Sequence, residues 1–460
     1  MTSTPAIDGA PSLVSVAFDL GTVGYAVHEH FVSGTATAYA AVAPFEPDGR
    51  WDAEETSAAE FTTRCVVHSP LDPSHANGTV IFEWLNVTGG LDFPAVWMMS
   101  HRHLVRDGYT WVGVTAQIVG LEGGGMLPGL GLQQTAPDRY ASLVHPGDVY
   151  SYDLFTETAR EVRSLLTEEY DIPVERMIAV GTSQSAFHLT TYINAVDPIA
   201  QYFDGFILQG RSGSGAPIEG WTIRSFDPAE AENQRARLDG RDRIREDARV
   251  PVMVFQSETD VFGRLAYLPA RQPDSANFRL WEIAGAAHAD TYVLRVAAVD
   301  SGSLPVDELG ALMAMADATG LPTELPINSG PQAHFVLQRA IDAMHCWTQD
   351  GTPPPSAPRL EADNDGELVR DDLGIGCGGV RTPWVDVPAK IFSGIGQPGE
   401  MMTLFGTTQP LADEVRAARY PGGQDQYAEE FHAATQKAVD AGFLLAADAD
   451  EIDALGALAW

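Results

Sequence analysis

Short apolar runs alternate with amphipathic stretches along most of the chain. The runs lack strict polar and apolar alternation, which is typical of strands buried on both faces, and the stretches between them carry apolar residues at helical spacing. This alternation predicts an α/β fold with a mostly parallel central sheet and helices on both faces. The predicted strands lie at 78–87, 111–117, 176–183, 203–210, 249–260 and 278–285, and the predicted helices at 148–170, 186–196 and 334–351.

Three parts of the chain depart from this rhythm. The N-terminal part is β-rich, two insertions interrupt the later strands, and a Pro-rich joint, "TPPPSAPRL", precedes the last hundred or so residues. Insertions beyond the carboxyl ends of strands are places where lids grow. We therefore expect an α/β core at 1–351, with a β-rich part at 1–77 and lid-like insertions at 211–248 and 289–330, and a C-terminal extension packed on that core at 352–460.

The charge balance is strongly acidic. The 460 residues carry a formal net charge of −35, only two of them are lysines, and 45% are hydrophobic. Such a surface repels phosphate backbones and anionic lipid, so we expect no nucleic-acid partner and no membrane partner. The first cationic residue is Arg50, so no basic signal region is visible and a cytoplasmic location is expected, with export left open. Oligomeric state does not follow from the sequence.

The cysteines form no metal-binding spacing and no disulfide framework. There are three, Cys65, Cys346 and Cys377, and reduced thiols are the default expectation, with a Cys346–Cys377 bridge as the alternative in an exported protein. The stretch 361–372, "EADNDGELVRDD", nearly fits a calcium loop, but Glu opens it and Asp closes it, so a hairpin is the better interpretation. We expect no metal and no cofactor.

The stretch "RMIAVGTSQSAFHL" places a serine between a buried strand and a helix. Gly181 and Ser185 stand two residues before and two residues after Ser183. Small residues are needed there because the turn is tight and larger side chains would meet the adjoining strand and helix. This pattern predicts a nucleophile elbow, with a final serine where glycine is more usual. Ser183 is the candidate nucleophile.

The partners of such a serine follow it in the order acid, then histidine. The strand predicted at 249–260 ends in Glu258 and Asp260, and the next predicted strand leads to a small-residue turn with His288. The separation of 28 residues (288 minus 260) accommodates one helix and one strand. Asp260 is the preferred acid, Glu258 remains the alternative, and His334 is the fallback for His288. Because strand ends share one edge of the sheet, we expect these groups to gather there.

An oxyanion site needs two backbone donors. One is the N–H of Gln184, directly after the nucleophile, and the other belongs to the loop that follows the strand at 78–87. Val87 is the preferred donor of that loop and Asn86 the alternative. The glycine-rich stretch 120–129 follows a different strand, so it is interpreted as a rim loop.

Three residues are candidates for contact with substrate. Trp97 and Met98 follow the oxyanion loop and could line a pocket, although Met and aromatic side chains more often fill the core. Arg211 lies beyond a strand end in a glycine-rich stretch that is equally suited to a hinge.

With Ser183, Asp260 and His288 placed, the chain resembles the α/β-hydrolase superfamily. More narrowly, it resembles bacterial α/β-hydrolase domain-containing proteins with esterase-like members. The resemblance covers most of the chain and rests on "FEWLNVTGG", "HPGDVYSYDLF", "VGTSQSA", "LPINSGPQAHFVLQRAIDAMHCW" and "GGVRTPWVDVP". It implies the α/β-hydrolase fold and hydrolysis of an ester.

These observations predict a serine carboxylic ester hydrolase that acts on a small-molecule ester through an acyl-enzyme. Lactonase, thioesterase, peptidase and acyltransferase activities share that step and remain alternatives. A non-catalytic hydrolase-like binding protein is the alternative from another class.

Overall fold

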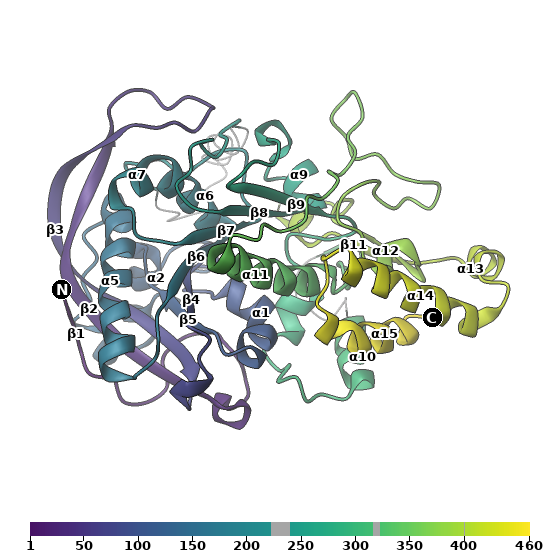
Figure 1. Ribbon diagram of the computed structural model, residues 1–460, viewed down its shortest axis with the longest axis horizontal. Coiled ribbons are helices and arrows are strands. Elements are labelled where there is room, and N and C mark those ends of the chain that lie inside the picture. Colours follow the sequence, from purple (N-terminus) through teal and green to yellow (C-terminus); the bar gives the residue numbers. More distant parts are fainter. Residues whose placement is uncertain (222–239, 316–322, 400) are drawn as a thin grey trace. The chain divides into compact units, whose positions relative to one another are not determined.

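The computed structural model describes residues 1–221, 240–315, 323–399 and 401–460. It divides the chain into two compact units. Unit 1 consists of Met1–Val252 and Pro269–Phe278, and unit 2 of Met253–Leu268 and Arg279–Trp460. Figure 1 shows the elements of both units along the chain.

Unit 1 is built on a sheet in the order β1-β2-β3-β5-β4-β6-β7. The pairs β2/β3 and β3/β5 are antiparallel, whereas β4/β5, β4/β6 and β6/β7 are parallel. The sheet therefore joins an N-terminal antiparallel hairpin, the long purple ribbon of Figure 1, to a parallel part that supports the candidate site. Its strands are β1 Thr2–Ser3, β2 Tyr25–Ala41, β3 Ala53–Pro70, β4 Thr79–Trp84, β5 Thr110–Val114, β6 Arg176–Thr182 and β7 Gly205–Gln209.

Helices cover both faces of the parallel part. All six residues of β4 are buried, although neighbouring side chains of a strand point to opposite faces. The rings of Phe82 and Trp84 pack on Phe155 of one helix, α5, while the carboxylate of Glu83 accepts hydrogen bonds from Val96 and Trp97 at the start of another, α1. The helices of unit 1 are α1 Ala95–Arg106, α2 Ile118–Glu122, α3 Leu132–Thr135, α4 Pro137–Tyr140, α5 Ser151–Glu169, α6 Gln184–Thr191 and α7 Asp197–Ala200.

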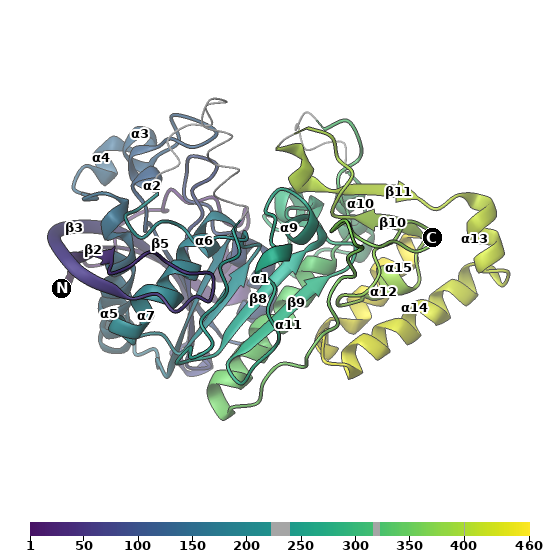
Figure 2. The same cartoon turned by 90° about the horizontal axis from the view of Figure 1, so that it is seen from above.

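Unit 2 contains two strands that are adjacent in the sheet order, β8 and β9, and a separate antiparallel hairpin, β10/β11. Figures 1 and 2 show α14 and α15 side by side near the C-terminus. The strands are β8 Val252–Ser257, β9 Phe278–Ile283, β10 Lys390–Ser393 and β11 Thr407–Pro410; all of β8 and β9 except their first residues belongs to unit 2. The helices are α9 Glu258–Phe262, α10 Val306–Ala314, α11 Gln332–Asp350, α12 Pro383–Asp386, α13 Asp413–Arg419, α14 Gly423–Asp440 and α15 Ala449–Leu458.

The predicted order of strands and helices is confirmed, with one shift that matters for the site. The strand predicted to run to 260 ends at Ser257, and Glu258 and Asp260 lie in the first turn of α9. The Ser257 side chain accepts a hydrogen bond from the N–H of Asp260 and the Asp260 carboxylate accepts one from the N–H of Ser257, so this capping box begins the helix there.

The compact units divide the chain after Val252, whereas the domain boundary expected from sequence follows 351. Residues 352–460 share unit 2 with α11 and with β9. The indole N–H of Trp281 in β9 donates a hydrogen bond to the carbonyl of Pro355. Of the two predicted lid-like insertions, residues 222–239 and 316–322 lie outside the described residues, so the lid assignment stays a prediction. The stretch 361–372 forms a hairpin, with an antiparallel bridge between Ala362 and Leu368.

Two further features concern the thiols and the hydrophobicity of the helices. All three cysteines are free thiols, and burial raises the pKa of Cys65 to about 12. Within the described ranges, no helix combines the length and apolar character needed to cross a bilayer.

Candidate active site

Ser183 occupies a strained turn between β6 and α6. Its φ is 59° and its ψ is −123°, a backbone conformation that residues other than glycine rarely adopt and that costs about 1–3 kcal/mol. The turn is closed by a hydrogen bond from the Ser183 N–H to the Gln209 carbonyl of β7, 2.8 Å. A Cβ on Gly181 would lie 3.0 Å from the side chains of Leu189 and Ser185, which explains the small residue at that position. Ser183 is only partly buried and directly follows the last residue of β6.

The loop that follows β4, residues 86–93, lies beside this turn. Asn86 and Phe93 pair at its base through two backbone hydrogen bonds of 3.0 and 2.8 Å. The side-chain amide of Asn86 donates to the carbonyl of Thr182, 2.9 Å, and its oxygen accepts from the N–H of Thr88. The loop is therefore tied directly to the residue that precedes Ser183. We call residues 86–93 the β4 loop.

Backbone hydrogen bonds show which of the predicted oxyanion donors already have an acceptor. Gln184 is the first residue of α6, and N–H groups of the first helical turn have no carbonyl acceptor within the helix. The N–H of Asn86 is already donated to Phe93, which leaves Val87 as the better candidate of the loop pair. The carbonyl of Val87 closes a turn by accepting from Gly90.

The glycine-rich stretch 120–129 packs on the β4 loop. The N–H of Met126 donates to Thr88 and the N–H of Leu127 donates to Gly89, at 3.0 and 3.3 Å. A Cβ on Gly90 would lie 2.2 Å from the carbonyl oxygen of Gly124, so the two backbones meet where only glycine fits. The stretch predicted to be a rim loop thus braces the predicted oxyanion loop.

In unit 2, His288 and Asp260 form a hydrogen-bonded pair. The Nδ1 of His288 lies 2.6 Å from Oδ1 of Asp260, and the two side chains are 9% and 3% exposed. The second carboxylate oxygen of Asp260 accepts from the N–H and the hydroxyl of Ser257, at 2.6 and 2.8 Å. Since a carboxylate only accepts, the shared proton is assigned to Nδ1, and Nε2 of the neutral ring is left as a proton acceptor.

Glu258, the alternative acid, is used elsewhere in unit 2. One of its oxygens accepts from the N–H of Gly285 at 2.7 Å, and the other accepts from the N–H of Gly394 at 2.8 Å and the hydroxyl of Ser393 at 3.1 Å. The side chain is completely buried, and burial raises the pKa of Glu258. Glu258 thus connects the turn that carries His288 to the end of β10.

Thr259 makes a second link between the same segments. Its hydroxyl donates to the carbonyl of Gly394 and accepts from the N–H of His288, at 2.5 and 3.2 Å. A Cβ on Gly394 would lie 2.3 Å from the carbonyl oxygen of Ala286, which shows how closely the strand end packs on the turn. The backbone of His288 is therefore held through residues more than a hundred positions later (394 minus 288 is 106).

The three predicted substrate-binding residues are buried. Trp97 is 0% and Met98 2% exposed in α1, where the Trp97 ring packs edge-on against His68. Arg211 is 0% exposed and donates to the backbone carbonyls of Ser212 and Asp242. These contacts are those of core residues, and contact with substrate stays a prediction for all three. The fallback histidine, His334, is buried in α11 and stacks on Tyr292 with ring centroids 3.8 Å apart.

The predicted site residues are thus gathered in two groups. Ser183, Gln184 and the β4 loop are brought together in unit 1, and Asp260 and His288 are brought together in unit 2. The contacts of Glu258 and Thr259 with Ser393–Gly394 were not predicted, because no local pattern reports a hydrogen bond between segments so far apart in the chain. Among the described residues, no group of three or more His, Cys, Asp or Glu side chains has the arrangement of a metal site.

Comparison with known families gives the class. A family model described as the alpha/beta hydrolase domain matches residues 2–454. The chain therefore belongs to the alpha/beta hydrolase domain family, and its fold is the α/β-hydrolase fold that the sequence predicts.

Several solved structures are similar over part of the chain. One of two fungal esterases from Rhizomucor miehei matches at 12% identity and a TM-score of 0.29, over 63% of this chain and 84% of its own. The esterase Est22 matches at 11% identity and a TM-score of 0.31, over 64% and 80%. The methylesterase BT1017 matches at 15% identity and a TM-score of 0.28, over 58% of this chain but only 48% of its own. No curated protein matches the sequence.

Proposed function

We propose that this protein is a serine carboxylic ester hydrolase in which Ser183 is the nucleophile, His288 the general base and Asp260 the residue that orients it. The observation that carries the proposal is the backbone of Ser183. A residue other than glycine held at φ 59° between a strand and a helix is the arrangement that exposes a nucleophilic hydroxyl in this fold.

The hydrogen-bonded pair in unit 2 supplies the second requirement. A serine hydroxyl is a weak nucleophile at neutral pH, so a base must remove its proton during attack. Asp260 holds Nδ1 of His288, which leaves Nε2 to take that proton, and it stabilises the imidazolium that forms. The proposal requires Nε2 to reach the Ser183 hydroxyl in the active enzyme.

The steps follow from these roles. The Ser183 oxygen bonds to the ester carbonyl carbon as its proton passes to His288, and the negative oxygen accepts from the N–H groups of Gln184 and Val87. The tetrahedral intermediate then loses the alcohol, which takes the proton from His288, and an acyl-enzyme remains. Water, activated by the same histidine, attacks the acyl carbonyl and releases the acid and the free serine.

A fluorophosphonate probe tests the nucleophile, because it phosphonylates an activated serine. We expect one labelled peptide containing Ser183, a burst of p-nitrophenol from a short-chain p-nitrophenyl ester, and loss of both in Ser183→Ala.

The chain offers a matched control in Ser185, which lies two residues away and is fully buried. Ser185→Gly introduces the residue more usual at that position and should keep the label and the burst. Labelling at another residue, or ester hydrolysis that survives Ser183→Ala, would refute the assignment.

A further inference from the structure

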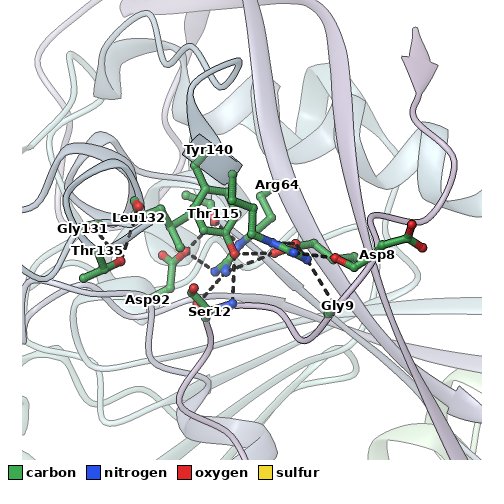
Figure 3. A network of polar contacts seen from close by, with 12 residues as sticks. Asp8, Gly9, Ser12, Arg64, Asp92, Thr115, Gly131, Leu132, Thr135 and Tyr140 are labelled. Atoms are coloured by element: carbon green, nitrogen blue, oxygen red, sulfur yellow. Dashed lines mark hydrogen bonds and ion pairs between the residues drawn. The ribbon is translucent and has the colours of Figure 1, made fainter. Parts of the chain in front are cut away.

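A buried network of charged side chains stands behind the β4 loop. It contains two guanidinium groups, Arg64 and Arg139, and two carboxylates, Glu29 and Asp92, so its formal charge is zero. Arg64 and Asp92 are labelled in Figure 3. Arg64 and Glu29 are completely inaccessible at their side chains, and that of Asp92 is 1% exposed. Arg64 comes from β3 and Glu29 from β2, whereas Asp92 belongs to the β4 loop itself.

The Asp92 carboxylate is fixed from two directions. Its Oδ2 accepts from Nη2 of Arg64 at 2.6 Å and from the hydroxyl of Thr115 at 2.5 Å, and that hydroxyl in turn accepts from Nε of Arg64 at 3.1 Å. Burial raises the pKa of Asp92, and the charge of Arg64 opposes this rise. A Cβ on Gly120 would lie 2.2 Å from Oδ1, so the carboxylate occupies space that only a glycine leaves open.

The far side of the network is held to the strand hairpin and to the N-terminal segment. Arg64 also donates to the carbonyl of Ser12, 2.8 Å. Arg139 donates to Glu29 and to the carbonyl of Asp8, and the hydroxyl of Tyr140 donates to Glu29 at 2.9 Å. Figure 3 shows Ser12, Asp92 and Thr115 gathered around Arg64. The Arg64 guanidinium that binds Asp92 is thus also held by Ser12 and Glu29.

From Asp92 the contacts continue toward the nucleophile. Asp92 directly precedes Phe93, whose backbone pairs with Asn86, and Asn86 donates to the carbonyl of Thr182. Val87, the preferred oxyanion donor, lies between these two anchors. Each end of the β4 loop is thus tied down, one end to the Ser183 turn and the other to the buried network.

Stability alone does not explain such a network. Replacing a buried ion pair by apolar side chains of similar volume is often neutral or stabilising, because two charges must be taken out of water. What an ion pair braced by a hydroxyl provides is a single orientation. In this protein the oriented group is the carboxylate of Asp92, in the same loop as the candidate oxyanion donor Val87.

We propose that Asp92, held by Arg64 and Thr115, is a positioning residue that fixes the β4 loop so that the N–H of Val87 faces the developing oxyanion. This inference rests on the proposed ester hydrolysis and adds to it residues that do not touch substrate. A loop released from Arg64 leaves the Ser183 turn intact but moves one of the two oxyanion donors.

The test compares Asp92→Asn with Glu29→Gln. Both substitutions preserve shape and remove one negative charge from the same network, but the Glu29 carboxylate contacts Arg64, Arg139 and Tyr140, all outside the loop. Removal of one oxyanion donor lowers kcat by about 10²- to 10³-fold, and a displaced donor should cost about 10- to 100-fold. We expect that fall in kcat for Asp92→Asn on a p-nitrophenyl ester, with little change in KM, and a near-normal kcat for Glu29→Gln.

Two further readouts separate positioning from loss of folding. Affinity for an alkyl boronic acid, whose serine adduct places an oxygen in the oxyanion site, should fall with kcat in Asp92→Asn. Amide hydrogen exchange should rise in residues 86–93 in this variant and stay unchanged there in Glu29→Gln. If Asp92→Asn does not fold, Thr115→Val removes the bracing hydroxyl at constant shape and should show the same pattern in weaker form.

Equal losses of kcat in Asp92→Asn and Glu29→Gln, or an unchanged kcat in Asp92→Asn, would overturn the positioning role while leaving the esterase proposal standing. A wild-type enzyme that neither reacts with the fluorophosphonate nor hydrolyses the ester would instead refute the proposed function, and the oxyanion assignment with it.

Discussion

Replacing Asp260 by asparagine should reverse the proton arrangement of the candidate histidine. The Asp260 oxygen Oδ2 accepts two hydrogen bonds from Ser257, and Oδ1 accepts one from His288. In Asp260→Asn the single remaining oxygen will face Ser257, because an amide nitrogen there could not accept from the Ser257 N–H. The NH₂ group must then face Nδ1 of His288.

An NH₂ group donates, so the imidazole has to accept at Nδ1 and carry its proton on Nε2. A ring with a protonated Nε2 cannot take the proton of Ser183. The same substitution at the orienting acid of a serine protease lowers kcat by about 10⁴-fold with the geometry intact. At 1.36 kcal/mol per factor of ten, that corresponds to about 5 kcal/mol of transition-state stabilisation.

Glu258→Gln is the matched comparison, since it makes the same chemical change in the acid that the sequence left as the alternative. Glu258 accepts from Gly285, Gly394 and Ser393 rather than from an imidazole. This variant should lose about 1–3 kcal/mol of stability for each buried donor left unpaired and should keep the histidine tautomer. Its kcat at a temperature where it is folded should therefore exceed that of Asp260→Asn by at least about 100-fold.

The assay is steady-state hydrolysis of a p-nitrophenyl ester, with thermal unfolding followed by circular dichroism for each variant. A near-normal kcat in Asp260→Asn together with a loss of about 10⁴-fold in Glu258→Gln would refute the role assigned to Asp260. That result would make Glu258 the orienting acid and the observed Asp260–His288 hydrogen bond irrelevant to catalysis.

Three further outcomes are expected. Burial raises the pKa of Glu83 to about 7, so the folded state binds this proton more tightly than the unfolded state. The stability contributed by Glu83 therefore falls as the pH rises from about 4.5 to 7. Denaturant titrations should show the stability of Glu83→Gln rising relative to that of the wild type across this pH range, and a constant difference would contradict the prediction. Gly394→Ala places a Cβ 2.3 Å from the carbonyl oxygen of Ala286, so its melting temperature and kcat should both fall, whereas a change in neither would show that the strand end yields. Titration with a thiol reagent should count three thiols in denaturant and leave Cys65 unreactive in the native protein, and fewer than three would reveal a bridge.

The sequence was informative wherever function depends on local geometry. The strand before Ser183, the small residue at Gly181 and the helix after it are all encoded within about a dozen neighbouring positions, and the structure has them as predicted. Asp260 was preferred because it was expected at the end of a strand. In the structure the strand ends at Ser257, and Asp260 contacts His288 from the first turn of helix α9.

What the sequence did not reveal depends on contacts between distant segments. Arg64 stands in a strand between Thr63 and Cys65, and no short motif around it reports that its guanidinium is buried. Its partner Asp92 is 28 positions away, and Glu258 and Gly394 are 136 positions apart. Hydrogen bonds of this kind follow from how the strands are brought together, which periodicity and turn signals do not encode.

The link between the His288 turn and Gly394 has a consequence during synthesis on the ribosome. Ser183 and its turn are complete early, but the backbone that holds His288 acquires its supports at Ser393 and Gly394 only when most of the chain has been translated. A nascent chain that ends before this point carries Ser183 without the contacts that hold the backbone of the proposed base. The proposed ester hydrolysis should therefore be absent from ribosome-bound chains that end before residue 393.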